Sequence, residues 1–238
     1  MPIYDHVLVT GASRGLGAAI GRALLARGHR VVLTARSADQ LAAAADALQA
    51  EYGGRVQWLA ADLADPVAAQ SLIGEVEQRF GAVDALVNNA GIGTWKPLVE
   101  WSADEVIMCT QLNLLAPMLL ARAALPGMLS RRCGYIVNIA SDLARRPLAK
   151  MAPYVASKYG LLGFSASLLR EVKGGGVKVS AVLPGIIDTA FNGALEGSKD
   201  DTWAMRPDAL AAQIVALFAL PENVVIDELT IHPLHQEF

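Results

Sequence analysis

Thr10-Gly11-Ala12-Ser13-Arg14-Gly15-Leu16-Gly17 is the stretch that decides the fold. The apolar run Val7–Val9 precedes it, and a helical pattern from Ala18 to Arg27 follows it. A strand, a glycine turn and a helix in this order let a phosphate group approach the N–H groups at a helix start. Glycine-rich turns also join strands to helices without binding a ligand, so the motif gains its weight from this context. The context favours binding of a dinucleotide.

Strands and helices alternate along the rest of the chain. Short β-branched or apolar runs predict further strands at 31–34, 56–60, 85–87, 135–139, 177–183 and 224–231. Segments with helical spacing lie at 38–51, 66–80, 102–129, 154–172 and 207–220. This alternation predicts an α/β fold with a doubly wound, Rossmann-like parallel sheet of about seven strands. We expect a single domain over residues 1–238, with a substrate loop at about 186–206.

Polar residues and glycines gather where the predicted strands end. The strand ends carry the 10–17 turn, residues 34–36, Asp62, residues 88–91, Ser141 and residues 184–185. In doubly wound sheets, ligands bind outside the carboxyl ends of the strands. This edge of the sheet is therefore the expected binding site.

The residues after the second strand indicate which dinucleotide binds. An acidic residue there would bind the ribose 2′-hydroxyl of NAD, whereas an arginine suits the 2′-phosphate of NADP. The sequence reads Thr34-Ala35-Arg36-Ser37, without a carboxylate, and Arg14 adds a second guanidinium from the glycine turn. Two guanidiniums with neighbouring hydroxyls form a plausible phosphate clamp, and the alternative is two solvated surface arginines. We predict NADP(H) in preference to NAD(H).

Composition narrows the classes of partner. The formal charge of −3 gives no electrostatic reason to expect nucleic acid or an acidic membrane surface. The most apolar region, 112–129, is interrupted by Asn113, Pro117, Arg122 and Pro126, which argues against a membrane span. Two cysteines and no Cys/His cluster suggest neither a disulfide framework nor a metal site. The N-terminus reaches a predicted strand without a signal peptide, so we expect a cytoplasmic protein.

Tyr154 and Lys158 are the candidates for proton transfer. Four residues apart at the start of a predicted helix, they share one face of it. A neighbouring ammonium favours the phenolate, so we expect the pKa of Tyr154 to fall from its usual value of about 10. Taken alone, the pair is more simply two residues on a helix surface.

Together, these motifs resemble the short-chain dehydrogenase/reductase family, in its short, single-domain branch. The resemblance rests on the 10–17 turn, Asp62, Asn88-Asn89-Ala90-Gly91, Asn113, Ser141, Tyr154-x3-Lys158, Pro184-Gly185 and Thr189, which follow the family's order. It implies a catalytic tetrad of Asn113, Ser141, Tyr154 and Lys158. It also implies cofactor contacts from Gly11, Ser13, Arg14, Gly15, Leu16, Gly17, Arg36, Asp62, Leu63, Asn89, Ala90, Gly91, Tyr154, Lys158, Pro184, Gly185, Ile187 and Thr189.

The resemblance implies a role for each member of the tetrad. Tyr154 would give its proton to the carbonyl oxygen as hydride reaches the carbon, and Ser141 would donate a hydrogen bond to the same oxygen. Lys158 would lower the pKa of Tyr154 and hold the nicotinamide ribose, while Asn113 would hold a water on a proton relay. Two plainer interpretations stay open: Asn113 as a polar residue at a helix bend, and Ser141 bonded to its own backbone.

Segments beside the tetrad carry the expected substrate contacts. These are Ser141, Leu143, Met151, Tyr154, Ile186 and Phe191, with Ile92, Trp95 and Leu195 as further apolar candidates. Arg145 or Arg146 could hold a substrate carboxylate or phosphate, or both could be exposed at a loop tip. The small residues Ala156, Gly160, Gly163 and Ser167 mark one face of the helix. In the family this helix often packs against its mate, so we expect a homodimer or homotetramer.

We therefore expect an NADP-dependent oxidoreductase that interconverts a small carbonyl compound and an alcohol. The ending Val225–Pro233 is similar to family members that act on 3-hydroxy acids or 3-oxoacyl thioesters. The alternative is a non-catalytic NADP-binding sensor, although such proteins usually lose the tyrosine or the lysine. A nucleotide-sugar epimerase would normally need a larger C-terminal substrate domain, for which the residues after 190 leave little room.

Overall fold

A parallel sheet forms the centre of the molecule. The computed structural model describes residues 4–195, 197–200 and 202–236, and within them seven strands pair in the order β3-β2-β1-β4-β5-β6-β7. Their bounds are β1 His6–Thr10, β2 Arg30–Thr34, β3 Val56–Trp58, β4 Ala85–Asn88, β5 Gly134–Ile139, β6 Val177–Pro184 and β7 Glu228–Ile231. All six neighbouring pairs are parallel. The strand order reverses at β1, between β2 and β4, which is where ligands bind in such sheets.

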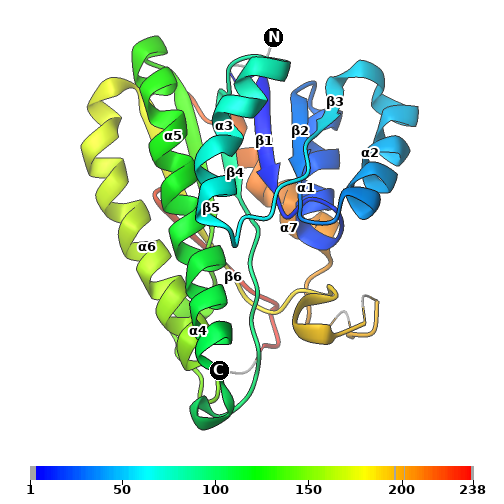
Figure 1. The fold of residues 1–238 in the computed structure, drawn as a ribbon, viewed down its shortest axis with the longest axis vertical. Coiled ribbons are helices and arrows are strands. Elements are labelled where there is room, and N and C mark those ends of the chain that lie inside the picture. Colours follow the sequence, from blue (N-terminus) through cyan, green and yellow to red (C-terminus); the bar gives the residue numbers. More distant parts are fainter. Residues whose placement is uncertain (1–3, 196, 201, 237–238) are drawn as a thin grey trace.

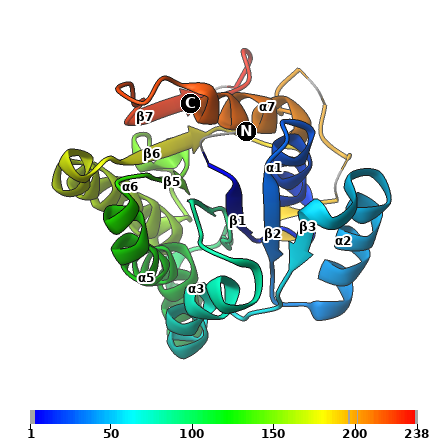
Figure 2. The ribbon, with the colours of Figure 1, turned by 90° about the horizontal axis from the view of Figure 1, so that it is seen from above.

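Helices cover both faces of this sheet. Figure 2 shows α1 (Gly15–Ala26) and α7 (Pro207–Ala216) on one side and α3 (Pro66–Phe80), α5 (Ala116–Arg131) and α6 (Ala152–Val172) on the other. Helix α2 (Ala38–Tyr52) covers the end of the sheet near β3 (Figure 1). The predicted doubly wound α/β fold is confirmed.

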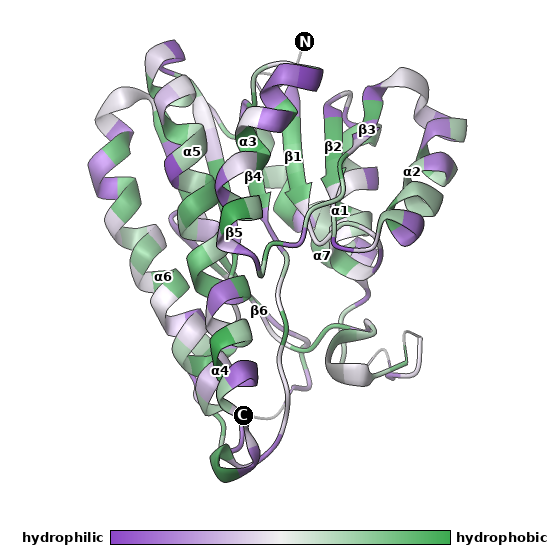
Figure 3. Cartoon of the chain, in the orientation of Figure 1, coloured by the Kyte–Doolittle hydropathy of each residue, from purple (hydrophilic) through white to green (hydrophobic). Residues whose placement is uncertain are grey.

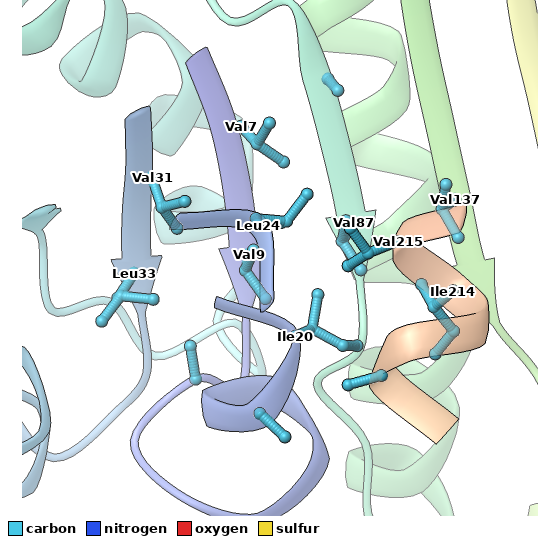
Figure 4. Close-up of a cluster of buried hydrophobic side chains, with 14 of the residues drawn as sticks. Val7, Val9, Ile20, Leu24, Val31, Leu33, Val87, Val137, Ile214 and Val215 are labelled. Atoms are coloured by element: carbon cyan, nitrogen blue, oxygen red, sulfur yellow. The ribbon is translucent and has the colours of Figure 1, made fainter. Parts of the chain in front are cut away.

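The strands β1, β2, β4, β5 and β6 contribute side chains to two separate cores. Val7 and Val9 of β1 pack with α1 and α7 on one face, as Figure 4 shows, whereas Leu8 packs with α3 and α5 on the other. Burial on both faces explains why the strands read as unbroken apolar runs. Figure 3 shows the same pattern, with hydrophobic strands and hydrophilic residues on the outer helices and loops.

Element ends follow local capping chemistry. The Asp65 carboxylate accepts a hydrogen bond from Val67 N (2.9 Å) at the start of α3, and Pro66 occupies the first turn. The last strand begins at Glu228 rather than at the predicted residue 224, because the chain turns after α7 with Val224 N bonded to Pro221 O (3.0 Å). The third strand likewise ends two residues earlier than predicted, at Trp58.

The predicted long helix contains a change of helical type. Helix α4 (Ala103–Thr110) runs into a π-helical segment, η3 (Gln111–Leu115), and then into α5. By length and composition, residues 103–131 could cross a membrane, a test that buried core helices also pass. Here Leu120, Ala124 and Met128 of α5 pack into the core against the sheet. The cytoplasmic location stays a prediction.

The small-residue face of α6 is mostly open. Ala156, Gly163 and Ser167 are exposed, whereas Gly160 packs against Leu114 of the same chain. The homo-oligomer stays a prediction.

Candidate active site

One large cavity lies at the carboxyl edge of the sheet, the lower edge in Figure 1, with a volume of about 760 Å³. Every predicted cofactor residue lines it: Gly11, Ser13, Arg14, Gly15, Leu16, Gly17, Arg36, Asp62, Leu63, Asn89, Ala90, Gly91, Tyr154, Lys158, Pro184, Gly185, Ile187 and Thr189. Residues from distant parts of the chain therefore line the same cavity, as the positions of the predicted strand ends indicate.

The glycine turn fits a phosphate group. Gly11 has a φ of +65°, and a Cβ on Gly17 would lie 2.3 Å from the Gly11 carbonyl oxygen, so side chains are excluded where the backbone folds on itself. Asn89 Nδ2 holds the turn by donating to Thr10 O (2.9 Å) and Gly11 O (3.2 Å). No side chain caps α1, whose first turn has no acidic residue. Its first N–H groups are thus available to an anion.

Two guanidiniums lie at the far end of the cavity. Arg14 and Arg36 line the wall and are exposed, and neither guanidinium makes a hydrogen bond or ion pair with the described residues. The neighbouring hydroxyls are less available than predicted, because Thr34 Oγ1 donates to Leu59 O (2.6 Å) and Ser37 Oγ caps α2 by accepting from Gln40 N (3.4 Å). Any phosphate clamp here consists mainly of the two arginines.

Tyr154 lies at the opposite end, with 8% of its surface exposed. Phe191 packs edge-on against its ring at a centroid distance of 5.8 Å. Burial raises the pKa of Tyr154 to about 12, and the side-chain hydrogen bond with Ser141 offsets part of this rise. The predicted lowering of this pKa is therefore wrong for the protein without cofactor, because desolvation of the phenolate is the largest effect on it.

Lys158 lies one helical turn further along α6. Its Nζ donates to Ile139 O (2.8 Å) and lies 5.7 Å from the centre of the Tyr154 ring. Burial lowers the pKa of this ammonium to about 8. Lys158 and Tyr154 are thus both protonated at neutral pH, a state suited to giving a proton rather than taking one.

Asn113 is the member of the predicted tetrad that does not line the cavity. It is fully buried in the π-helical segment, where Nδ2 donates to Ile92 O (2.8 Å) and Ser157 Oγ (3.1 Å). Its Oδ1 accepts from Ile92 N (2.8 Å). The side chain therefore fixes the Ile92 backbone beside a helix irregularity, as the plainer interpretation predicts, and its role in a proton relay stays a prediction.

Ser141 bonds to its own backbone and also faces the cavity. Its Oγ accepts from Leu143 N (3.2 Å) at the start of the short helix η4 (Asp142–Ala144) and donates to Asp142 Oδ1 (3.2 Å). The interpretation of Ser141 as bonded to its own backbone is confirmed, and its catalytic role stays a prediction. The partner Asp142 was not predicted, and it is buried on the cavity wall.

Apolar side chains make up much of the remaining cavity wall. The predicted Leu143, Met151, Ile186 and Phe191 line it, and so do Ile92, Trp95, Met108, Leu112, Leu148 and Trp203. Leu195 does not, since 78% of its surface is exposed elsewhere. Met108 and Leu112 lie one helical turn apart just before Asn113, a spacing from which they could have been inferred.

The two candidate arginines have different surroundings. Arg145 pairs with Glu228 through two hydrogen bonds, Nε to Oε1 (3.2 Å) and Nη2 to Oε2 (2.6 Å). Arg146 instead lines the cavity. Of the two, Arg146 is therefore the one positioned to meet a substrate.

The predicted substrate loop is irregular but anchored by a buried carboxylate. Asp188 Oδ1 accepts from Gly197 N (3.1 Å) and Lys199 N (3.3 Å), and its Oδ2 from Arg206 Nη1 (2.9 Å). Residues 196 and 201 of this loop lie outside the described residues. The anchor holds the loop that carries Phe191 over Tyr154.

Comparison with known proteins gives the family. A family model described as short chain dehydrogenase matches residues 5–200. The chain belongs to this family. The predicted membership is confirmed, and the protein is an oxidoreductase of the short-chain dehydrogenase type.

Three relatives within the family illustrate the similarity. The chain is 40% identical over 188 residues to a 3-oxoacyl-[acyl-carrier-protein] reductase of Salmonella typhimurium, covering 79% of this chain and 75% of that one. It is 36% identical to the enzyme of the same name from Vibrio cholerae, covering 94% and 93%. An alcohol dehydrogenase from Thermococcus sibiricus, solved with 5-hydroxy-NADP, superimposes with a TM-score of 0.92 at 31% identity and covers 98% of each chain.

Proposed function

We propose that this protein is an NADP(H)-dependent oxidoreductase that transfers hydride between the nicotinamide and a small carbonyl or alcohol, with Tyr154 as the general acid and base. One observation carries the proposal. A single cavity has an uncapped helix start and a glycine turn at one end and a buried tyrosine–lysine pair at the other. The first binds a phosphate and the second supplies a proton.

The cofactor is NADP(H) rather than NAD(H). Arg14 and Arg36 give the adenosine end a positive charge, and residues 34–37 include no carboxylate that would hold a free ribose 2′-hydroxyl. The related structure from Thermococcus sibiricus, which contains 5-hydroxy-NADP, supports this choice.

Proton transfer is the task of this chain's own residues, while the bound cofactor supplies or accepts the hydride. In reduction, the Tyr154 hydroxyl gives its proton to the carbonyl oxygen. The Lys158 ammonium then stabilises the phenolate left behind, and the Ser141 hydroxyl stabilises charge on the reacting oxygen. Because burial disfavours the phenolate, Tyr154 starts each reduction protonated. Asn113 holds the Ile92 backbone and, through Ser157, the helix α6 that carries Tyr154 and Lys158.

The substrates to test first are 3-oxo acids and 3-oxoacyl thioesters. Two relatives are 3-oxoacyl-[acyl-carrier-protein] reductases. The substrate end of the cavity offers an apolar wall that includes Trp95 and Phe191, with Arg146 as a cation. This combination suits a carbonyl compound with an apolar chain and an anionic end.

Steady-state kinetics of Tyr154→Phe test the proposal. Loss of the hydroxyl removes the proton donor, so we expect kcat to fall by roughly a hundredfold or more, with NADPH affinity nearly unchanged. Turnover is followed by NADPH absorbance with a panel of ketones, aldehydes and 3-oxo acids. Tyr159→Phe is the matched control, because Tyr159 is an exposed tyrosine on the same helix.

Two outcomes would contradict the proposal. Equal turnover by Tyr154→Phe and the wild type would remove Tyr154 from the chemistry. Tight NADPH binding without turnover of any carbonyl in the panel would favour the non-catalytic sensor.

A further inference from the structure

We propose that Asp142 and Gln236 form a positioning pair that holds the Ser141 hydroxyl for proton transfer. Through this pair, the segment that follows β7 becomes a working part of the active site. The inference rests on the proposed function, because Ser141 and Tyr154 must be reacting groups for their position to matter.

The pair links residues that are far apart in the sequence. Gln236 Nε2 donates to Asp142 Oδ2 (2.6 Å), and Asp142 Oδ1 accepts the Ser141 hydroxyl (3.2 Å). Ser141 and Tyr154 both line the cavity, and the Ser141 side chain lowers the pKa of Tyr154. Hydrogen bonds thus run from Gln236 through Asp142 to the Ser141 hydroxyl, which acts on the proton donor.

Both ends of the Gln236 amide are used. While its Nε2 holds Asp142, its Oε1 accepts from Ile186 N (2.9 Å), so the amide joins η4 to the first residue of the substrate loop. The backbone leaves room for it at Gly185, where a Cβ would lie 2.1 Å from Gln236 Oε1. The glycine at position 185 therefore allows the Gln236 amide to reach both of its partners.

The carboxylate determines what the Ser141 hydroxyl can do. Asp142 is only 5% exposed, and a buried carboxylate must be hydrogen-bonded to be tolerated. A serine has one hydroxyl proton, and this one is directed to Asp142. The Oγ is therefore held in place while no substrate is bound, and its proton turns from Asp142 to the reacting oxygen when a carbonyl binds beside Tyr154.

Asp142 also acts on Tyr154 by charge. Its negative charge raises the pKa of Tyr154, in addition to the larger effect of burial. The other groups that face this phenol are Ser141 beside Asp142, the Lys158 ammonium on the same helix, and Cys109 of α4, whose thiol also raises the pKa. Asp142 is the carboxylate in this set, so it favours the protonated acid.

Exchange of the carboxylate and the amide between positions 142 and 236 tests the pair. Asp142→Asn can accept from Gln236 Nε2 only by turning its own Nδ2 to Ser141 Oγ, which removes the acceptor that holds the hydroxyl. Gln236→Glu places two carboxylates face to face. The double variant restores every hydrogen bond, because a carboxylate at position 236 accepts from the new amide at position 142 and from Ile186 N.

We expect each single variant to lower kcat for reduction roughly tenfold or more, with KM and NADPH affinity within about threefold of the wild type, since a hydrogen bond to a charged group is lost. The double variant should recover kcat to within about threefold. The rising limb of its pH profile for alcohol oxidation, where Tyr154 must lose its proton, should still move to lower pH, because the charge now lies further from Tyr154. Gln213→Glu, an exposed glutamine of α7, is the matched control.

Hydrogen exchange gives a readout that does not depend on activity. In the protein alone, the Ile186 amide should exchange faster in Gln236→Glu, because Asp142 repels the new carboxylate, and return to the wild-type rate in the double variant. Should Asp142→Asn not fold, Gln236→Glu and the double variant carry the comparison.

The outcomes separate this inference from the proposed function. Single variants with wild-type kcat and Ile186 exchange would overturn the positioning pair, and so would a double variant that recovers neither. If Tyr154→Phe keeps wild-type turnover, it is the proposed function that fails.

Discussion

The buried Lys158 ammonium predicts a pH dependence of folding stability that Lys158→Met removes. Folding lowers the pKa of Lys158 from 10.5 to about 8, because the charge is desolvated. Between these values the unfolded chain binds the proton and the folded chain does not, so stability rises with pH. The gain in stability from losing the Lys158 charge is complete above 10.5, the pKa in the unfolded chain. It is lost as the pH falls through about 8, the pKa in the folded chain.

The magnitude follows from the two pKa values. At about 1.4 kcal/mol for each pKa unit, the ammonium destabilises the fold by roughly 3 kcal/mol at neutral pH. Most of this cost disappears by about pH 10, so the wild type should gain roughly 2–3 kcal/mol relative to Lys158→Met between about pH 7 and about pH 10. The difference between the unfolding free energies of the two proteins is used because groups that titrate alike in both then cancel.

Urea unfolding at the two pH values measures this difference, in the protein without cofactor. Lys173→Met is the matched control, because Lys173 is an exposed lysine at the end of the same helix, and it should keep the pH dependence of the wild type. The reasoning is refuted if Lys158→Met and the wild type show the same change in unfolding free energy.

Three further substitutions probe the two ends of the cavity. Arg36→Ala should weaken NADPH binding roughly ten- to a hundredfold with little change for NADH, because charge-assisted hydrogen bonds are worth about 1.5–3 kcal/mol. Fluorescence titration with both nucleotides measures these affinities. An unchanged preference for NADPH over NADH would show that Arg36 does not bind the 2′-phosphate. Gly17→Ala would place a methyl group 2.3 Å from a carbonyl oxygen of the glycine turn. It should cost about 1–3 kcal/mol of stability and reduce NADPH affinity, whereas a wild-type Tm and Kd would show that α1 can shift to make room. Arg146→Ala should raise KM for a 3-oxo acid roughly fivefold and leave a neutral ketone unchanged. Arg145→Ala serves as its control because Arg145 does not line the cavity, and equal KM values in all three proteins would exclude a carboxylate contact at Arg146.

The elements that the sequence predicts best are those whose cause is local. The glycine turn needs Gly11 and Gly17 because the backbone approaches itself there, and any chain that folds this way must show them. The two-sided burial of β1 likewise appears directly as the apolar run Val7–Val9. Tyr154 and Lys158 are four residues apart on one helix, so their proximity is also a local property.

The features that sequence reasoning missed depend on contacts between distant segments. Gln236 meets Asp142 across 94 positions, and neither residue belongs to a periodic pattern or motif that would connect them. The pKa of Tyr154 was predicted to fall because the neighbouring lysine is visible in the sequence, whereas burial, which raises it, is a property of the packed fold. Asn113 in the π-helical segment contacts the Ile92 backbone, 21 residues away, and the order of residues does not reveal this contact.

The two ends of the cavity are built in different ways, and this difference bears on how substrate preference is set. The dinucleotide end is held by the sheet and by backbone geometry, since Asn89 fixes the turn through carbonyl oxygens. The substrate end is held by side chains from loops: Asp188 anchors the segment that carries Phe191, and Gln236 joins Ile186 to Asp142. Substitutions in the loops can therefore alter the substrate end while the glycine turn keeps its shape. Changes of substrate in this scaffold should accordingly leave nucleotide affinity nearly constant.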